Sequence, residues 1–388
     1  MKRSTERILT THCGSLARPA ALLELLQAQR DGEAYDPEQL DAELTKAVQA
    51  VVYQQAKAGI DVVTDGEQSK TGFAAYVRDR LEGFEPVPDG QGTNLVVTYT
   101  EERAAFPEYY EQYFGTGNMR GIAPQTQLRC VGPVKYKGKA LLQTDIANLK
   151  TALGSFQAEE AFMPASAPRG VGRNDYYKSE EEYLYAVAEA MREEYTGIVN
   201  AGFVLQIDDP ALTGFYGRAS TLPVDQRKKQ AEMYIEALNH ALRGIPREQV
   251  RFHTCYGINE GPRVYDTPLA DIIELMLKVN AGALSFEAAN PRHEHEYHVF
   301  EDVKLPESMV LIPGVVTHAS NIVEHPEWIA ERLIRYANLV GRENIIAGAD
   351  CGFSSQATFN PEVHPTVVWA KFQAMAEGAR LASDRLWK

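Results

Sequence analysis

The sequence has few cysteines and no long apolar run, and both shortages limit what the protein can be. Its 388 residues contain four cysteines, too few for the disulfide framework of a small secreted protein. No run of 18 apolar residues occurs, which argues against a transmembrane helix. Residues 1–7 carry charge without an apolar signal core behind them, so we expect a cytoplasmic protein.

Positive charge is also scarce. Lys and Arg number 39 against 53 Asp and Glu, which gives a net charge of −14. A surface of that sign repels nucleic acid and anionic membranes, so we expect neither as a partner. The hydrophobic content of 44% is high enough, in a chain of this length, to bury a large core.

A Gly-x-Gly-x-x-Gly motif is missing after the first strand-like run, which weakens a dinucleotide-binding interpretation. Short β-branched runs, typical of parallel strands covered on both faces, occur instead at residues 7–12, 59–64, 127–131, 203–207, 250–253, 283–286, 309–312 and 344–348. Amphipathic stretches lie between them, at 37–57, 179–201, 224–243, 267–279, 326–340 and 365–382. This alternation predicts an α/β fold, a (β/α)8 TIM barrel in one domain spanning residues 1–388.

Two segments interrupt the alternation. Residues 84–126 hold prolines, glycines and aromatic residues, and we expect them to form an insertion over the barrel mouth, at the C-terminal face of the strands. Residues 162–178 are also rich in proline and glycine and are interpreted as a loop in place of a regular connection. Long ordered loops in compact domains are usually functional. The aromatic run Tyr109–Phe114 fits either packing within the insertion or the lining of a substrate mouth.

Four side chains that bind soft metals each stand at the end of a strand-like run: His253 and Cys255, Glu287, and Cys351. Strand ends meet at one rim of a barrel. Two thiolates, one imidazole and one carboxylate suit a tetrahedral zinc ion. A zinc ion of this kind can also hold a substrate thiol as thiolate near neutral pH. The set therefore predicts Zn²⁺ as cofactor and chemistry on sulfur.

A rival metal site is the run His293-Glu-His-Glu-Tyr-His298. Three imidazoles so close in sequence can bind a transition metal, but a charged loop of this kind is also typical of a solvated surface or an ion-pair network. The thiolates favour the other set for zinc, and the role of the histidine run stays open.

The remaining predicted strands also end in polar groups, namely Cys13-Gly-Ser15, Asp65-Gly-Glu67, Arg129-Cys130, Asp208-Asp-Pro210 and His318. A single aspartate at a strand end often caps a helix or fixes a loop. Chargeable groups at every strand end are instead expected to converge on one rim.

These motifs resemble the C-terminal catalytic barrel of the cobalamin-independent methionine synthase family. That family lies in a superfamily with uroporphyrinogen decarboxylase and epoxyalkane:coenzyme M transferase. The similarity runs from Cys13-Gly-Ser15 to Cys351-Gly352, and the ordered series His-x-Cys, Glu, Cys is its specific part. The resemblance implies a zinc-dependent thiol S-methyltransferase that makes methionine from homocysteine, like the 5-methyltetrahydropteroyltriglutamate–homocysteine methyltransferases.

The resemblance also implies roles for matching residues. The implied zinc ligands are the four soft-metal residues, His253, Cys255, Glu287 and Cys351. Gly14 and Ser15 match a turn that binds the amino-acid carboxylate. Glu67 and Asp208 match two carboxylates that bind the homocysteine ammonium group.

For the donor half of the site the match is less complete. His318 matches a catalytic histidine after a one-residue gap, and Arg129-Cys130 matches a pair beside the folate. The family places a pterin-binding glutamate where this chain has Gly214, and a stacking tryptophan where residues 162–170 contain none. We therefore expect weak use of methyl-folate.

Two other functions stay open. A thiol alkyltransferase of the epoxyalkane:coenzyme M type would use the same zinc ion, although Glu67 and Asp208 would oppose a sulfonate. A non-catalytic zinc-stabilised binding barrel would leave His318 without a purpose. The expected partners are a homocysteine-like thiol and an alkyl donor. Methyl-folate, methylcobalamin, another methylated metabolite and an epoxide stay open as donors, and a homo-oligomer stays open as the assembly.

Overall fold

The computed structural model describes the whole chain except residues 74, 88–99, 116–120, 124–127, 170, 215–222 and 258–259. Eight parallel strands form a nearly closed barrel in the order β1-β11-β10-β9-β8-β7-β5-β2. Their bounds are β1 (Leu9–Thr10), β2 (Val62–Val63), β5 (Glu160–Ser166), β7 (Val204–Asp208), β8 (Val250–Thr254), β9 (Ala283–Phe286), β10 (Val310–Val316) and β11 (Ile346–Ala349). The first and last strands of this order, β1 and β2, approach each other where Asp61 N, just before β2, donates to Thr10 O of β1 (3.1 Å). The predicted (β/α)8 barrel is confirmed.

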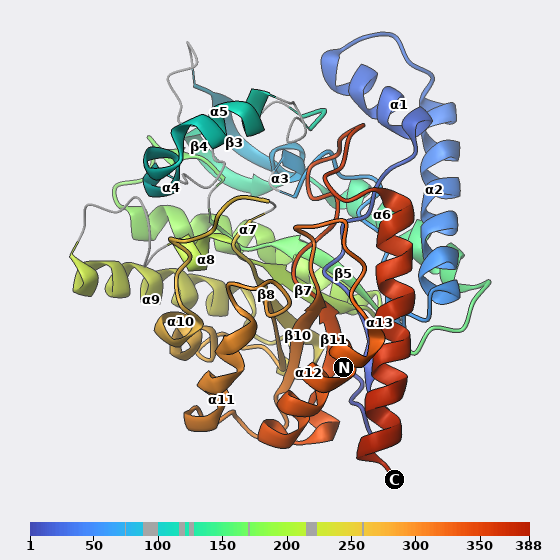
Figure 1. The fold of residues 1–388 in the computed structure, drawn as a ribbon. Coiled ribbons are helices and arrows are strands. Elements are labelled where there is room, and N and C mark those ends of the chain that lie inside the picture. Colours follow the sequence, from blue (N-terminus) through green and yellow to red (C-terminus); the bar gives the residue numbers. More distant parts are fainter. Residues whose placement is uncertain are drawn as a thin grey trace.

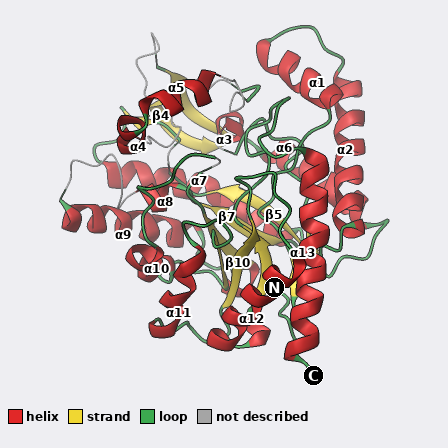
Figure 2. Cartoon of the chain, viewed as in Figure 1, coloured by secondary structure: helices red, strands yellow, loops and turns green. Residues whose placement is uncertain are grey.

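Helices surround these strands (Figures 1 and 2). The longer ones are α1 (Ala20–Asp31), α2 (Pro37–Lys57), α6 (Lys139–Leu153), α7 (Glu180–Asn200), α9 (Val224–Ala241), α10 (Leu269–Met276), α12 (Pro326–Val340) and α13 (Pro365–Leu386). Some of them are capped by side chains: the Asp36 carboxylate accepts from two backbone N–H groups at the start of α2, and Ser179 Oγ accepts from Glu182 N at the start of α7. Among the described helices, none combines the length and apolar character that a membrane crossing requires.

A buried polar layer crosses the barrel interior. Arg251 Nε donates to Gln206 Oε1 (2.6 Å), and the Arg251 guanidinium lies 3.6 Å from the centre of the Phe162 ring. Gln206 Nε2 donates in turn to Asp208 Oδ1 (2.7 Å). Residues two apart on a strand face the same side, so Arg251 lies one level below His253, and Gln206 one level below Asp208. The layer therefore supports the groups at the strand ends.

One predicted barrel strand is wrong. The run 127–131, whose first residue lies outside the described residues, corresponds to β4 (Leu128–Tyr136). This strand belongs to a separate three-stranded sheet in the order β3-β4-β6, with β3 (Leu81–Pro86) and β6 (Arg173–Asn174). A β-branched run favours a strand, but it does not say which sheet the strand joins.

The barrel strand in that place is β5, which overlaps the start of the segment 162–178 that was interpreted as a loop. That interpretation is wrong for residues 162–166. The strand pairs with β7 in parallel through five residues, and six of its seven residues are buried. It was missed because Pro164 lies in its middle, and proline argues against a central strand since it cannot donate to a neighbour.

The segment between β2 and β5 contains an inserted unit, residues 75–136, ahead of the connecting helix α6. Its described elements are α3 (Ala75–Arg80), β3, α4 (Thr100–Ala105), α5 (Pro107–Gly115) and β4. Figure 1 shows it at the end of the molecule opposite the C-terminus of α13. Because barrel helices run back against their strands, this is the end at which the strands finish. The insertion therefore lies on the expected side, and its position over the mouth stays a prediction.

Buried charges connect the inserted unit to the barrel helices. Arg80, at the end of α3, forms ion pairs with Asp145 of α6 and with Glu194 of α7 (3.1 Å to Glu194). Tyr136, at the end of β4, donates to the same Glu194 carboxylate (2.8 Å). At the outer end, Tyr113 of α5 donates to Glu362, which precedes α13. The unit is thus attached at two separate places.

Candidate metal and substrate site

Three of the four predicted metal ligands come together at the strand ends. His253 lies on β8, Cys255 follows that strand, and Cys351 follows β11. Their ligand atoms all lie within 4.8 Å of one another, and the two sulfurs are 3.1 Å apart. All three side chains are buried. We call these residues the thiolate cluster.

The two cysteines of the thiolate cluster share one hydrogen bond, and it shifts their pKa values in opposite directions. The Cys351 thiol donates to Cys255, which holds the pKa of Cys255 well below its usual range, whereas the same contact and burial raise that of Cys351. A buried thiol whose pKa is lowered gives up its proton more readily to a soft cation.

The orientation of His253 suits metal binding as well. Its Nδ1 lies 3.7 Å from Cys13 Sγ and 3.3 Å from Ser285 Oγ, while its buried Nε2 has no hydrogen-bond partner within the described part of the chain. A buried ring nitrogen without a partner is costly. Outer partners on one nitrogen commonly direct the other to a metal. The donor set therefore fits a zinc ion.

Glu287, the fourth predicted ligand, follows β9 but does not join the thiolate cluster. Its Oε1 accepts from Tyr256 N (2.7 Å), and its Oε2 accepts from Arg263 Nη2 (2.7 Å) and Asn290 Nδ2 (2.8 Å). Burial raises the pKa of Glu287, and the charge of Arg263 opposes that rise. Three donors on one carboxylate favour its ionised form, so Glu287 and Arg263 make a buried ion pair.

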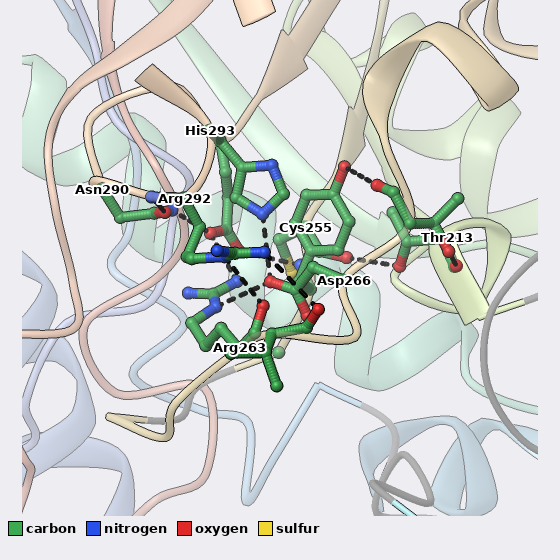
Figure 3. A network of polar contacts seen from close by, with 12 residues as sticks. Thr213, Cys255, Arg263, Asp266, Asn290, Arg292 and His293 are labelled. Carbon is green, nitrogen blue, oxygen red and sulfur yellow. Dashed lines mark hydrogen bonds and ion pairs between the residues drawn. The ribbon is translucent and has the colours of Figure 1, made fainter. Parts of the chain in front are cut away.

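The neighbouring histidine run does not gather its three imidazoles. His293 is buried, with Nε2 3.0 Å from the Asp266 carboxylate (Figure 3) and Nδ1 2.7 Å from that of Glu296, so both ring nitrogens are engaged. His298 is exposed and lies beside Glu301. In the described residues His293 belongs to no candidate metal group. The ion-pair network expected as the alternative accounts for His293.

His318 follows β10 and lies near Glu287 and Asp350, within 4.8 Å between the nearest ligand atoms. Its Nε2 is 2.9 Å from Gly257 O, and its buried Nδ1 has no partner in the described part of the molecule. Burial lowers the pKa of His318, so the ring is neutral. Because Nε2 must donate to the carbonyl, Nδ1 carries the free lone pair.

The two predicted ammonium-binding carboxylates lie in a buried region beside the thiolate cluster. Asp208 and His253 are register partners on β7 and β8. Burial raises the pKa of Asp208 to about 7, and the nearby charge of Glu67 contributes to the rise. Glu67 has φ +56, and its buried Oε2 has no partner within the described residues. Two like charges held together in this way can be satisfied by a cation between them.

The predicted carboxylate-binding turn lies against the same group. Gly14 has φ +127, and a Cβ there would come within 2.8 Å of Pro164 Cγ and 2.9 Å of Glu67 Oε1. Only glycine therefore fits at this position. Ser15 is buried and its hydroxyl lies 3.1 Å from that of Ser355.

Arg129 and Cys130 lie on the separate sheet rather than on a barrel strand. Arg129 is 3.6 Å from Glu85 of β3, and the Cys130 thiol donates to Gly132 O (3.3 Å). Both contacts lie within the inserted unit, so the expected position beside a folate stays a prediction.

Three residues of the site have no role in the sequence analysis. Cys13 was named only as part of its motif, yet it contacts His253. Lys70 is buried and donates to Pro164 O (2.6 Å). Arg263 pairs with Glu287 from a loop far along the chain. Lys70 follows Asp-Gly-Glu67 by three residues, which is a usable signal, whereas nothing in the sequence around Arg263 reveals its partner.

Comparison with known proteins agrees with this geometry. A family model for the catalytic domain of cobalamin-independent synthases matches residues 144–371. The methionine synthase of Sulfolobus acidocaldarius is 26% identical over 347 residues, which cover 88% of this chain and 85% of that protein. The methionine synthase of Saccharolobus solfataricus is 24% identical over 391 residues, with coverage of 97% and 95%.

Solved structures share the fold. A B12-independent methionine synthase from Shewanella, in complex with selenomethionine, has a TM-score of 0.73 at 19% identity, over 98% of this chain and 99% of that one. A protein from Listeria monocytogenes described as a vitamin-B12-independent methionine synthase has a TM-score of 0.66 at 16% identity, over 96% and 98%. The chain is a methyltransferase and belongs to the family of the cobalamin-independent synthase catalytic domain.

Proposed function

We propose that the protein is a zinc-dependent S-methyltransferase that converts homocysteine to methionine without cobalamin as a bound cofactor. The observation that carries the proposal is the thiolate cluster beside two carboxylates, the buried Glu67 and the half-buried Asp208. The methionine synthases to which the chain is similar support the choice of homocysteine.

The thiolate cluster would hold the zinc ion through two sulfurs and the free Nε2 of His253. When bound, zinc supplies a positive charge that keeps a substrate thiol ionised at neutral pH. The remaining chemistry belongs to the chain. Glu67 and Asp208 bind the substrate ammonium, and Gly14 and Ser15 bind its carboxylate.

Methyl transfer is a displacement in which the substrate sulfur forms a bond to the methyl carbon as the bond to the leaving group breaks. Fixing the sulfur and the methyl group in line supplies much of the rate. His318 presents Nδ1 as an acceptor, so it must take up a proton before it can donate one to the leaving group. Its burial keeps competing water away from that nitrogen.

The identity of the methyl donor is less well determined than that of the thiol substrate. Gly214, at the end of α8 (Ala211–Gly214), has no side chain to bind a pterin. Loss of that hydrogen bond and of a stacking tryptophan corresponds to ~2–4 kcal/mol, or roughly thirty- to a thousandfold in affinity. We therefore propose that methyl-folate is used weakly and that another methylated compound is the better donor.

A thiol-by-donor screen of the zinc-loaded protein, with products identified by mass spectrometry, tests the function. Methylation that requires homocysteine supports it. A preference for 2-mercaptoethanesulfonate with an epoxide would point to the coenzyme M type of reaction, and inactivity with every pair, zinc being present, would point to a binding barrel. Turnover of methyl-folate at a micromolar KM would contradict the donor proposal alone.

A further inference from the structure

Arg18 is a buried arginine whose guanidinium donates to backbone carbonyl groups of three loops. It lies two residues before α1. Its Nη1 donates to Leu16 O (3.2 Å) and to Ser354 O. Its Nη2 donates to Glu67 O (2.6 Å) and Lys70 O (2.8 Å). These carbonyl groups belong to the loops that follow β1, β11 and β2, so one side chain connects the ends of three barrel strands.

The same loops carry residues of the candidate site, namely Gly14 and Ser15 after β1, Glu67 after β2 and Cys351 after β11. They also contact one another directly. Leu16 N donates to Gly66 O (3.1 Å), and Phe353 N donates to Ser15 O (3.0 Å). Arg18 therefore lies where the groups assigned to the amino-acid end of a substrate meet the loop of a predicted metal ligand.

Glu67 shows most directly what Arg18 does. Its backbone has φ +56, in the left-handed region that side chains other than glycine rarely adopt. Such strain persists only where surrounding contacts require it. Here Glu67 N donates to Asp65 Oδ1 (2.9 Å), and Glu67 O accepts from Arg18. The two bonds fix the backbone on both sides of the side chain and so set the direction of its carboxylate.

We propose that Arg18 is a positioning residue that sets the distance between the amino-acid end and the sulfur end of the site, by holding the loops of Ser15, Glu67 and Cys351 together. The inference rests on the proposed function, in which Glu67 binds the substrate ammonium and Ser15 its carboxylate. Only two methylene groups separate the sulfur of homocysteine from the carbon that bears both charges. Both ends can therefore bind at once only where their spacing is fixed.

The geometry of the guanidinium, in addition to its charge, is needed for this role. A guanidinium presents its donors in a fixed planar fork, whereas the donors of a lysine ammonium leave one point. Arg18→Lys therefore cannot reach all three loops, and it leaves buried carbonyl groups without a donor. Burial lowers the pKa of Arg18 to about 10, and the charges of Glu67 and Asp65 oppose this fall. Lysine keeps a cation beside those two carboxylates, so Arg18→Lys separates the loss of geometry from the loss of charge.

The test compares two thiols on the protein loaded with Co²⁺, whose thiolate absorption reports thiol binding without any methyl donor. Homocysteine carries both charged groups, whereas 1-propanethiol has the sulfur and the carbon chain alone. Arg18→Lys should weaken homocysteine binding by ~10–100-fold and leave 1-propanethiol within about threefold, because displaced groups at one end do not affect the sulfur. The metal content should stay that of the wild type.

A double variant tests whether Arg18 acts through Glu67. Glu67→Gln alone should also weaken homocysteine binding selectively. In Arg18→Lys/Glu67→Gln the loss should be smaller than the product of the two single losses, because residues that act through one another are not additive. Arg335→Lys changes an exposed arginine of α12 and should leave the binding of both thiols unchanged.

Two results would overturn the proposal. Equal weakening of both thiols by Arg18→Lys, or loss of the metal, would show a general structural role. Complete additivity in the double variant would show that Arg18 does not act through Glu67.

Hydrogen exchange of the thiol-free protein tests the connection between the loops without any substrate. Arg18→Lys should speed exchange in residues 64–70 and 352–356 and leave residues 283–287, on β9, as in the wild type. Unchanged exchange in the first two segments would overturn the proposal. If the wild type does not bind homocysteine, the proposed function fails, and the exchange measurement still decides whether Arg18 holds these loops.

Discussion

The barrel and the inserted unit differ in how well their sequences determine where side chains lie. In the barrel, strand pairing places Asp208 beside His253 and His253 beside Ser285, so strand-end residues from distant parts of the chain become neighbours. In the inserted unit, Arg129 and Cys130 also lie on a β-branched strand, but their sheet has its own register. The comparison shows that a strand-end motif predicts a place at the barrel rim only when its strand belongs to the barrel.

The largest expected effect tests this distinction with cysteines. Cys255→Ala or Cys351→Ala should lose the metal, because either change leaves an incomplete ligand set in a site expected to hold about one zinc ion. Metal analysis of the purified variants measures this. Cys130→Ala, in the inserted unit, is the matched control and should keep its zinc. Full zinc content in both barrel variants would contradict the assignment.

The next effect concerns how the two regions are joined. Arg80→Met should destabilise the protein by ~3–5 kcal/mol, because Asp145 and Glu194 would be left buried without a cation. Denaturant unfolding measures the change, and limited proteolysis should show early cleavage in the inserted unit. Arg380→Met, which removes an exposed ion pair, should leave the unfolding midpoint in place. Equal stability of both variants would show that the buried pair does not anchor the unit.

A third prediction sharpens the account of the amino-acid side of the barrel. Asp208→Asn should lower kcat/KM for homocysteine by roughly ten- to a thousandfold, since a lost charge-assisted contact in a buried site costs ~1.5–4 kcal/mol. Steady-state kinetics measures this. 2-Mercaptoethanesulfonate, which lacks the amine, should be a poor substrate of the wild type. If it surpasses homocysteine, the two carboxylates do not select an ammonium group.

The smallest effect is a pH dependence of stability at the barrel rim. Burial lowers the pKa of His293, but its hydrogen bonds to Asp266 and Glu296 outweigh burial and raise it from 6.5 to about 9. Because His293 binds its proton more tightly in the folded protein, protonation stabilises the fold fully below pH 6.5. This contribution to the free energy of unfolding is lost as the pH rises through 9. The contribution amounts to ~3 kcal/mol.

The measurement is the free energy of unfolding of wild type and His293→Gln between pH 6 and pH 9.5. The difference between them should shrink steadily across this range. A difference that stays constant with pH would show that the imidazolium form is not what stabilises the network.

Sequence analysis predicted the barrel and the meeting of His253, Cys255 and Cys351, because apolar periodicity and strand-end position are local properties that a parallel barrel converts into proximity. Sequence analysis did not predict β5, because Pro164 within it argues against a central strand. It also assigned β4 to the wrong sheet, because the sheet that a strand joins depends on partners that are distant in the sequence. Sequence analysis also did not predict the ion pair between Arg263 and Glu287. This pairing depends on a left-handed backbone at Arg263 and on neighbouring buried charges. Neither feature produces a periodic pattern in the sequence.

Glu67 and Arg263 share an unusual cost, since each carries its side chain on a left-handed backbone. Glycine would relieve about 1 kcal/mol of strain at either position. Laboratory evolution that selects only for heat resistance would therefore tend to accumulate glycine at both positions. The resulting proteins would be robust, but they would have lost one carboxylate of the proposed ammonium-binding pair or the guanidinium beside Glu287. Improvement of this enzyme for industrial use would need a screen in which turnover and thermal endurance are scored together.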